Sequence, residues 1–388
     1  MKQGQALPAN PFYNSPEQRL ALARQRFFDD GVRPSGMVSE AVIQSWSRCL
    51  RSHGDPARNA VFEPVTPSRV HGALRGNRAL LDAASEELER LQVTLAGTSG
   101  TAMLTDAKGV VIGSTYAPTR SHEQLMPIAT RVGVNLAEEA VGTTAPGITA
   151  RTGQACLVMG CEHYFGNAQL MHCAAAPIRD VQGELAGVLD LSSEGLPFGF
   201  DAGAVVAHYA AEIENRLLCA QSTDHLVVRL QITPALLDTP MAALVGITRD
   251  GRIDWINAAA ARLLGLVAPI GQRARTRLED SLGVAVDTLA ALTSQGEAQP
   301  MHLPNGLMLW VRCEWRSPER HRHLHANGAV TSPQAPTSPP QPQPHTLRDT
   351  ERQTVLRVLA ESGGNVSRAA RTLGVSRGLI YRHLSGKD

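Results

Sequence analysis

Four polar side chains near the end of the chain have the types and the spacing to contact DNA. Arg377, Tyr381, Arg382 and His383 are predicted to share the outward face of one short helix. Such a helix can enter the major groove of a duplex, where side chains reach the edges of the bases. An arginine can donate two hydrogen bonds to one guanine, so Arg377 is the best candidate for contacting a base.

Three predicted helices would position these side chains. The first begins near Thr346, and Asn365 is a good N-cap for the second. Gly374 permits the positive φ that a tight turn needs, and Ser376 can then cap the third helix. The pattern is typical of a helix-turn-helix, in which the last helix carries the DNA contacts.

The charge of this segment supports the same interpretation. Residues 345–388 contain eight Lys and Arg against four Asp and Glu, which leaves +4 in a chain whose formal net charge is +1. A basic excess confined to one end suits a regulator with a small nucleic-acid-binding domain. An ordinary helical hairpin with a solvated basic face is the alternative interpretation.

Residues 364–384, with the sequence GNVSRAARTLGVSRGLIYRHL, resemble the Fis-type domain that ends bacterial enhancer-binding activators. The resemblance implies that the partner is double-stranded DNA and that Asn365 and Ser367 hold phosphates. This chain departs from the family at Leu379, where threonine is usual, and at His383, where lysine is common. The predicted DNA-binding residues are Asn365, Ser367, Arg368, Ser376, Arg377, Gly378, Tyr381, Arg382 and His383.

A group of cysteines and histidines in the middle of the chain could bind a metal or supply a nucleophile. Its members are Cys156, Cys161, His163, His172 and Cys173. Their spacing contains no C-x-x-C pair, and side chains that alternate along a strand point to opposite faces of a sheet. No third group that would orient a Cys–His pair is identifiable. We therefore predict buried thiols and hydrogen-bonded histidines, with no catalytic residue, metal or cofactor; an enzyme that uses this group is an alternative.

The order of predicted strands and helices indicates an α+β multidomain protein with antiparallel sheets and an all-α C-terminal domain. The predicted parts are a helical segment (1–95), a sheet domain (96–222), a second sheet domain (229–315), a Pro-rich linker (316–345) and the helix-turn-helix (346–388). The linker gives the clearest boundary, because residues 331–345 contain six prolines in fifteen positions and would form an extended tether.

Hydrophobic periodicity predicts the individual elements. Helices are expected at 39–50, 77–95, 200–218 and 257–266, and strands within 102–112 and at 154–159, 173–178, 185–191, 243–248, 252–256 and 307–314. The helix over 77–95 has nearly heptad spacing, so it could pair with its copy in a dimer or pack on the neighbouring domain. Trp255 and Trp310 are expected to pack in the core of the second sheet domain, with a ligand wall as the less favoured alternative.

Several motifs of the body carry a second resemblance. They are Ser-Trp-Ser-Arg-Cys at 45–49, Leu-Thr-Asp-Ala-Lys-Gly-Val-Val at 104–111, and residues 142–149, 162–165, 173–180, 187–192, 247–253 and 257–260. In order and spacing they resemble a GAF domain followed by a PAS domain, as in the regulators of acetoin and glycerol catabolism. The resemblance implies an unidentified small-molecule effector, with Thr143, Thr144, His163 and Cys173 as candidate ligand-binding residues. Where the family usually has Asn-Ala-Ile-Gly, this chain has Thr-Ala-Pro-Gly at 144–147, and its proline would stiffen a loop over the pocket.

One part of those regulators has no counterpart in this sequence. They normally carry a AAA+ ATPase before the DNA-binding domain, and nothing here matches its phosphate-binding loop, G-x-x-x-x-G-K-[ST]. We therefore expect a non-enzymatic transcriptional regulator that binds DNA as a homodimer, with RNA polymerase as a further candidate partner. A protein–protein signalling adaptor, or a competitor of a full-length sigma-54-dependent activator, is the alternative.

Composition bounds the remaining properties. Apolar residues make up 43% of the 388 and charged residues 19%, which are globular values. The six cysteines are scattered, as in reduced proteins of the cytosol. No uncharged apolar run reaches the length of a membrane span. We therefore expect a cytoplasmic protein without membrane contact.

Overall fold

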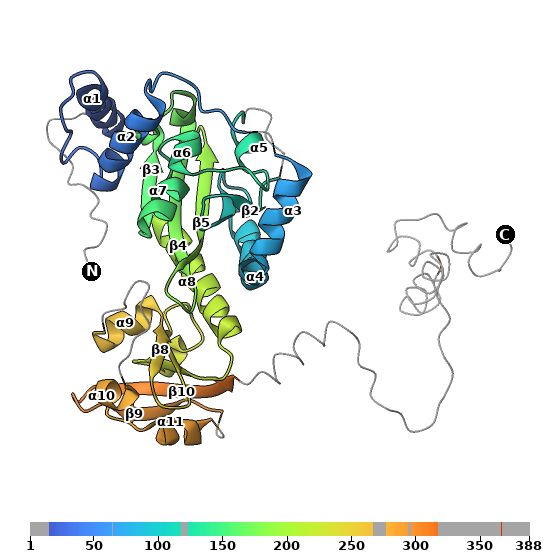
Figure 1. Ribbon diagram of the computed structural model, residues 1–388, viewed down its shortest axis with the longest axis vertical. Helices are drawn as coiled ribbons and strands as arrows, with labels where there is room; N and C mark the ends of the chain where they lie inside the picture. Colours follow the sequence, from blue (N-terminus) through green and yellow to red (C-terminus); the bar gives the residue numbers. More distant parts are fainter. Residues whose placement is uncertain are drawn as a thin grey trace. The chain divides into compact units, whose positions relative to one another are not determined.

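The computed structural model describes residues 15–63, 65–117, 123–266, 277–293 and 296–316, together with Val366 alone. All of these except Val366 belong to one compact unit of the chain, residues 1–325. This unit contains two antiparallel sheets with helices packed on them (Figure 1).

The first sheet has five antiparallel strands in the order β2-β1-β5-β4-β3. The strands are β1 (Thr101–Asp106), β2 (Val111–Ser114), β3 (Cys156–Met159), β4 (Met171–Arg179) and β5 (Leu185–Glu194). Side chains of β4 alternate between two apolar layers, since Cys173 and Ala175 lie in one and Ala174, Ala176 and Ile178 in the other. Both faces of the sheet are therefore covered, which explains the long apolar runs of its central strands.

Different helices cover the two faces. The face of Cys173 packs on α1 (Pro16–Phe28), α2 (Glu40–His53), α5 (Met126–Ala129), α6 (Glu138–Val141) and α7 (Ala145–Thr152). The opposite face packs on α3 (Pro67–Gly76), α4 (Arg78–Thr94) and α8 (Ala202–Gln221). Short 3₁₀ helices among the described residues are η1 (Gly160–Glu162), η2 (Asn167–Leu170) and η3 (Pro234–Leu236).

The second sheet also has five antiparallel strands, in the order β8-β7-β6-β10-β9. The strands are β6 (His225–Gln231), β7 (Ala243–Ile247), β8 (Ile253–Ile256), β9 (Gln299–His302) and β10 (Met308–Arg316). One face packs on α9 (Ala258–Leu264), α10 (Leu278–Leu282) and α11 (Val286–Leu292). Leu226, Val228 and Leu230 point into this core, whereas Val227 between them faces the other side.

Helix α8 packs on both sheets. Val206, Ala210 and Ile213 lie in the core under the first sheet. Leu218 and Cys219, near the end of the helix, pack against the back of the second sheet. Asn215 of α8 accepts a hydrogen bond from the amide of Asn257 at 2.8 Å. The last turns of α8 therefore contribute to the packing of both sheets, as its course in Figure 1 also shows.

The predicted α+β class with antiparallel sheets is confirmed. The helix predicted at 39–50 is α2, which Ser39 caps by accepting a hydrogen bond from Val42 N. The helix predicted at 77–95 is α4. Strand β6 was not expected, because only three residues separate it from the end of α8. The predicted helices of 346–388 lie outside the described residues.

The prediction that both tryptophans pack in the core of the second sheet domain is confirmed for Trp255 alone, which lies in a buried cluster on the face of the sheet beside α8. Trp255 is only 4% exposed, but it packs on the back of the second sheet beside α8 and not in the main core. Its cross-strand neighbour is Gly246, which leaves room for the indole on that face. Trp310 is half-buried and outside the main core.

Candidate functional site

The predicted DNA-binding residues, from Asn365 to His383, lie outside the described residues. Their assignment therefore stays a prediction. The candidate ligand-binding residues are described, and they lie in the first sheet domain, on the face of Cys173.

A small cavity lies on this face. Its volume is about 40 Å³, room for about three water-sized groups. Strands β1, β4 and β5, the segment entering α5, the start of α7 and the segment before α3 form its walls. Ten of its lining residues are apolar, and the four polar ones are Thr144, His163, Cys173 and Ser192. A mostly apolar wall with a few polar groups is typical of a small-ligand site.

Three of the four predicted residues line this cavity, namely Thr144, His163 and Cys173. Thr143 is fully buried and does not line the cavity. Its hydroxyl oxygen lies 2.8 Å from Ser45 Oγ and 3.5 Å from Cys49 Sγ, so it ties α2 to the domain. The structure thus brings three of the candidates together and assigns the fourth to helix packing.

The segment with the unusual proline is a helix start, not the loop that was expected. Thr144 caps α7 by accepting a hydrogen bond from Gly147 N at 3.0 Å. Pro146 lies in the first turn, where its missing N–H costs nothing because that position has no partner within the helix. Pro146 also lines the cavity.

A chain of hydrogen bonds runs along one wall of the cavity. His163 Nδ1 lies 3.1 Å from Gly160 O, which accepts only, so Nδ1 carries the proton. His163 Nε2 is then free to accept from Cys173 Sγ at 3.4 Å. Ser192 Oγ lies 3.1 Å from that sulfur and 2.6 Å from Asp190 Oδ2.

Burial shifts the titratable members of this chain toward their neutral forms. It lowers the pKa of His163 to about 4 and raises the pKa of Asp190 to about 7. It also raises the pKa of Cys173 well above that of a free thiol. With Asp190 protonated, protons point in one direction, from Asp190 to Ser192, Cys173, His163 and Gly160 O. In that state a lone pair of Ser192 Oγ is left for a ligand, which favours an uncharged group that can donate a hydrogen bond.

Two residues that the sequence analysis missed hold the cavity wall. Glu194 accepts hydrogen bonds from the backbone N–H groups of Gln124, Leu125 and Met126 at 2.8, 3.0 and 3.0 Å. It thereby fixes the segment from which Leu125 reaches the cavity. A glutamate at the end of an apolar strand was the only signal for this role in the sequence.

Arg24 of α1 holds the segment around His163. Its guanidinium donates to His163 O at 2.8 Å, to Tyr164 O at 2.5 Å and to Cys161 O at 3.3 Å. Trp46 of α2 adds a hydrogen bond from its indole N–H to Glu162 O at 2.7 Å. The N-terminal helices therefore position one of the four polar groups of the cavity.

Over the described ranges, no three His, Cys, Asp or Glu side chains are grouped so that they could hold a metal ion. Within the same ranges, no helix is long and apolar enough to cross a membrane.

Two family models match the chain. Residues 16–197 match the MimR N-terminal domain, and residues 346–385 match the Fis family of bacterial regulatory proteins. The first match contains the whole cavity, and the second contains all the predicted DNA-binding residues.

Curated relatives are transcriptional regulators. The acetoin catabolism regulatory protein of Cupriavidus necator is 30% identical over 257 residues, which cover 64% of this chain and 36% of that protein. The propane 2-monooxygenase operon transcriptional activator MimR of Mycolicibacterium smegmatis is 31% identical over 199 residues, which cover 50% of this chain and 32% of that protein. The chain therefore spans about a third of the length of these relatives.

Among solved structures, the chain is similar to the Escherichia coli DhaR(N)–DhaL complex. The identity is 18% and the TM-score 0.43, with 71% of this chain and 99% of that chain covered.

Proposed function

We propose that a small uncharged metabolite controls the binding of this chain to DNA. The proposal proceeds from the two family matches, since the chain combines a match to the MimR N-terminal domain with a match to the Fis family, as a bacterial transcriptional regulator with a sensory domain does. The observation that carries the proposal is the cavity beside the hydrogen-bond chain of Asp190, Ser192, Cys173 and His163. Because burial disfavours charge on each titratable member of this chain, an ion would enter at a high cost.

The effector class follows from the size and polarity of the cavity. A small molecule with a hydroxyl group could donate a hydrogen bond to the remaining lone pair of Ser192 Oγ and bury its methyl groups against Met103 and Leu125. Acetoin, which appears in the name of the Cupriavidus relative, carries such a hydroxyl. Since acetoin is larger than the cavity described, in this proposal the segment held by Glu194 moves outward to admit it. We therefore propose acetoin or a similar small hydroxyketone or alcohol as the effector.

The proposed mechanism is a population shift. The cavity is bounded by the sheet on one side and by the segment held by Glu194 on the other. A ligand that contacts both walls stabilises one arrangement of the sensory domain, and DNA affinity changes only if that arrangement suits the operator. In this proposal the regulator acts in the cytoplasm as a homodimer and has no ATPase activity. It would change transcription by recruiting RNA polymerase, by repression, or by competing with a full-length relative.

The test begins with genome-wide mapping of bound DNA, which yields an operator. A gel-shift titration of the full chain on that operator is then run with acetoin and with lactate, an anion of similar size. We expect acetoin to change the operator affinity by about fivefold or more, a typical coupling between two sites. We expect lactate to change it little.

Two neighbouring serines provide the matched variants. Ser192→Ala removes a hydroxyl that lines the cavity and should abolish the response to acetoin. Ser193→Ala removes an equally buried hydroxyl that bonds to Ser99 and Leu196 O, away from the cavity, and should preserve the response. An unaltered response in Ser192→Ala would contradict the assignment of the cavity, whereas equal affinity for operator and random duplex would contradict DNA regulation itself.

A further inference from the structure

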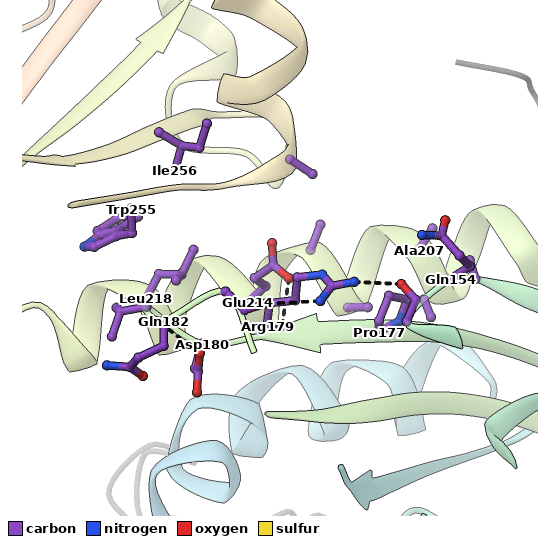
Figure 2. Close-up of a pocket in the computed structure, with 18 of the residues that line it drawn as sticks. Gln154, Pro177, Arg179, Asp180, Gln182, Ala207, Glu214, Leu218, Trp255 and Ile256 are labelled. Atoms are coloured by element: carbon purple, nitrogen blue, oxygen red, sulfur yellow. Dashed lines mark hydrogen bonds between the residues drawn. The ribbon is translucent and has the colours of Figure 1, made fainter. Parts of the chain in front are cut away.

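The small cavity is closed to solvent. Of its described lining residues, all except Phe62 and Thr144 are buried. A larger pocket of about 460 Å³ beside α8 is open instead, because Gln154, Gln182 and Ala207 in its lining are exposed (Figure 2). A ligand can therefore reach the small cavity only if part of a wall moves.

One wall of the small cavity is an irregular segment, residues 54–63, here called the strap. All of its residues are described, and they form neither a helix nor a strand. Ala60, which is buried, and Phe62 line the cavity, whereas Val61 between them is 75% exposed. The strap therefore covers the cavity with two side chains on one side, while its other side faces solvent.

The two ends of the strap are fixed to the domain. At the start, the hydroxyl of Tyr164 donates to Gly54 O. At the end, Glu63 forms an ion pair with Arg69 of α3, in which Oε2 and Nη1 are 2.8 Å apart.

The middle of the strap is held mainly by one side chain. Asn167 Oδ1 accepts from Ala60 N at 2.8 Å, and Asn167 Nδ2 donates to Ala60 O at 3.3 Å. Gly166 N adds a bond to Arg58 O at 3.3 Å. Hydrogen bonds between neutral groups contribute modestly to stability, so a segment held by few of them opens at a small cost in free energy.

We propose that the strap is a movable cover of the small cavity and that the side-chain amide of Asn167 holds it closed. When the two bonds to Ala60 break, Ala60 and Phe62 leave the cavity wall while the ends of the strap stay in place. The inference rests on the function proposed above, since the cover gives the effector its route of entry. The segment held by Glu194, on another wall, gives a bound ligand its room.

Cys173 reports on the strap, because it lines the cavity and is only 4% exposed. The test treats the purified full-length chain with methyl methanethiosulfonate, a small thiol reagent, and follows each cysteine by peptide mass spectrometry. The rate of modification at Cys173 then measures how often the cavity opens. Asn167→Ala should raise this rate about tenfold, as expected for the loss of two hydrogen bonds.

Two pairs of variants separate the strap from other effects. Phe62→Ala removes a ring from the cavity wall and should also raise the rate at Cys173, whereas Val61→Ala changes the exposed neighbour and should not. Asn77→Ala is the control for Asn167→Ala. It removes a similar bond, from Asn77 Nδ2 to Ala73 O at 2.9 Å, outside the lining of the cavity, and should leave the rate unchanged.

Cys156 provides an internal control, since it is buried in the same domain but does not line the cavity. Equal acceleration of Cys156 and Cys173 in Asn167→Ala would overturn the proposal, because it would show that the whole domain opens. An unchanged rate at Cys173 would overturn it as well, because entry would then not pass the strap.

Acetoin should slow the modification of Cys173 in the wild type by occupying the cavity. If Asn167→Ala accelerates Cys173 but acetoin gives no protection, the effector proposal fails and the strap stands as the cover of the cavity.

Discussion

The carboxyl group of Asp190 is buried in an apolar strand, so its ionisation changes the stability of the folded protein. Its Oδ1 atom has no hydrogen-bond partner among the described residues, and burial raises its pKa from 3.8 to about 7. The unfolded chain therefore ionises at a lower pH than the folded chain, so the stability contributed by Asp190 falls as pH rises from about 4 to about 7. The effect of His163 on stability has the opposite pH dependence, because burial lowers its pKa from 6.5 to about 4. The stability that neutral His163 contributes is therefore lost as pH falls through that range.

Replacing Asp190 by asparagine should therefore stabilise the protein at alkaline pH. Asp190→Asn keeps the shape and a donor for Ser192 but cannot ionise. We expect a gain on the order of 3 kcal/mol in the free energy of unfolding at pH 8 and a smaller gain at pH 5. Urea denaturation of the full chain at both pH values measures the difference.

Asp82→Asn is the control, since the side chain of Asp82 is 60% exposed and should change the pH dependence little. A variant of Asp190 no more stable than the wild type at pH 8 would show that this carboxyl carries no burial cost.

At the scale of elements, the back of the second sheet depends on a close fit between β7 and β8. A Cβ atom at Gly246 would lie 2.0 Å from Trp255 Nε1, within the volume of the indole. Gly246→Ala should therefore displace Trp255 and lower the free energy of unfolding by about 2 kcal/mol. Thermal denaturation followed by tryptophan fluorescence measures both effects.

Gly199→Ala provides the comparison, because nothing lies within 4 Å of a Cβ at that position. Combining Gly246→Ala with Trp255→Leu should recover part of the loss, since the smaller side chain makes room for the methyl group. If Gly246→Ala were as stable as Gly199→Ala, the packing described for Trp255 would be wrong.

The elements that the sequence predicted best have strong local signals. α2 and α4 combine helical periodicity with a polar residue immediately before the first turn. Strand β6 lacked such a signal, because its apolar side chains pack on both faces and it follows α8 after three residues.

The candidate site was predictable only in part. Cys173 and His163 were visible as residue types, but their contact depends on how β4 and the segment after η1 meet. The hydroxyl of Thr143 forms a hydrogen bond with Ser45, 98 positions earlier in the chain, and no local sequence pattern predicts such a distant partner. Asp190 was visible as one acid inside the apolar run Val-Leu-Asp-Leu, and this signal was not used.

At the scale of the whole molecule, the proposed function depends on DNA recognition by residues 346–385, which match the Fis family. Arg377→Ala should lower the preference for operator over random duplex by about tenfold to a hundredfold, the value of one bidentate contact with a base. Non-specific binding should change little. Gel-shift titration with competitor DNA measures the preference.

Arg382→Ala is the contrasting variant, because we expect Arg382, farther along the same predicted helix, to contact a phosphate and so to position the protein without reading the sequence. It should weaken binding to operator and random duplex alike and reduce the salt dependence by about one counterion. Should Arg377→Ala retain full preference, the third predicted helix would not be the one that contacts the bases.

The shared helix α8 has a practical consequence for anyone who divides this protein into fragments. A cut between residues 222 and 224 would leave Leu218 and Cys219 uncovered on the first piece and Val227, Leu244 and Trp255 uncovered on the second. Bare apolar faces of this kind promote aggregation. A fragment meant to isolate the second sheet should therefore start at Asp201 and carry α8 with it, and the same helix must be retained in any fragment of the first.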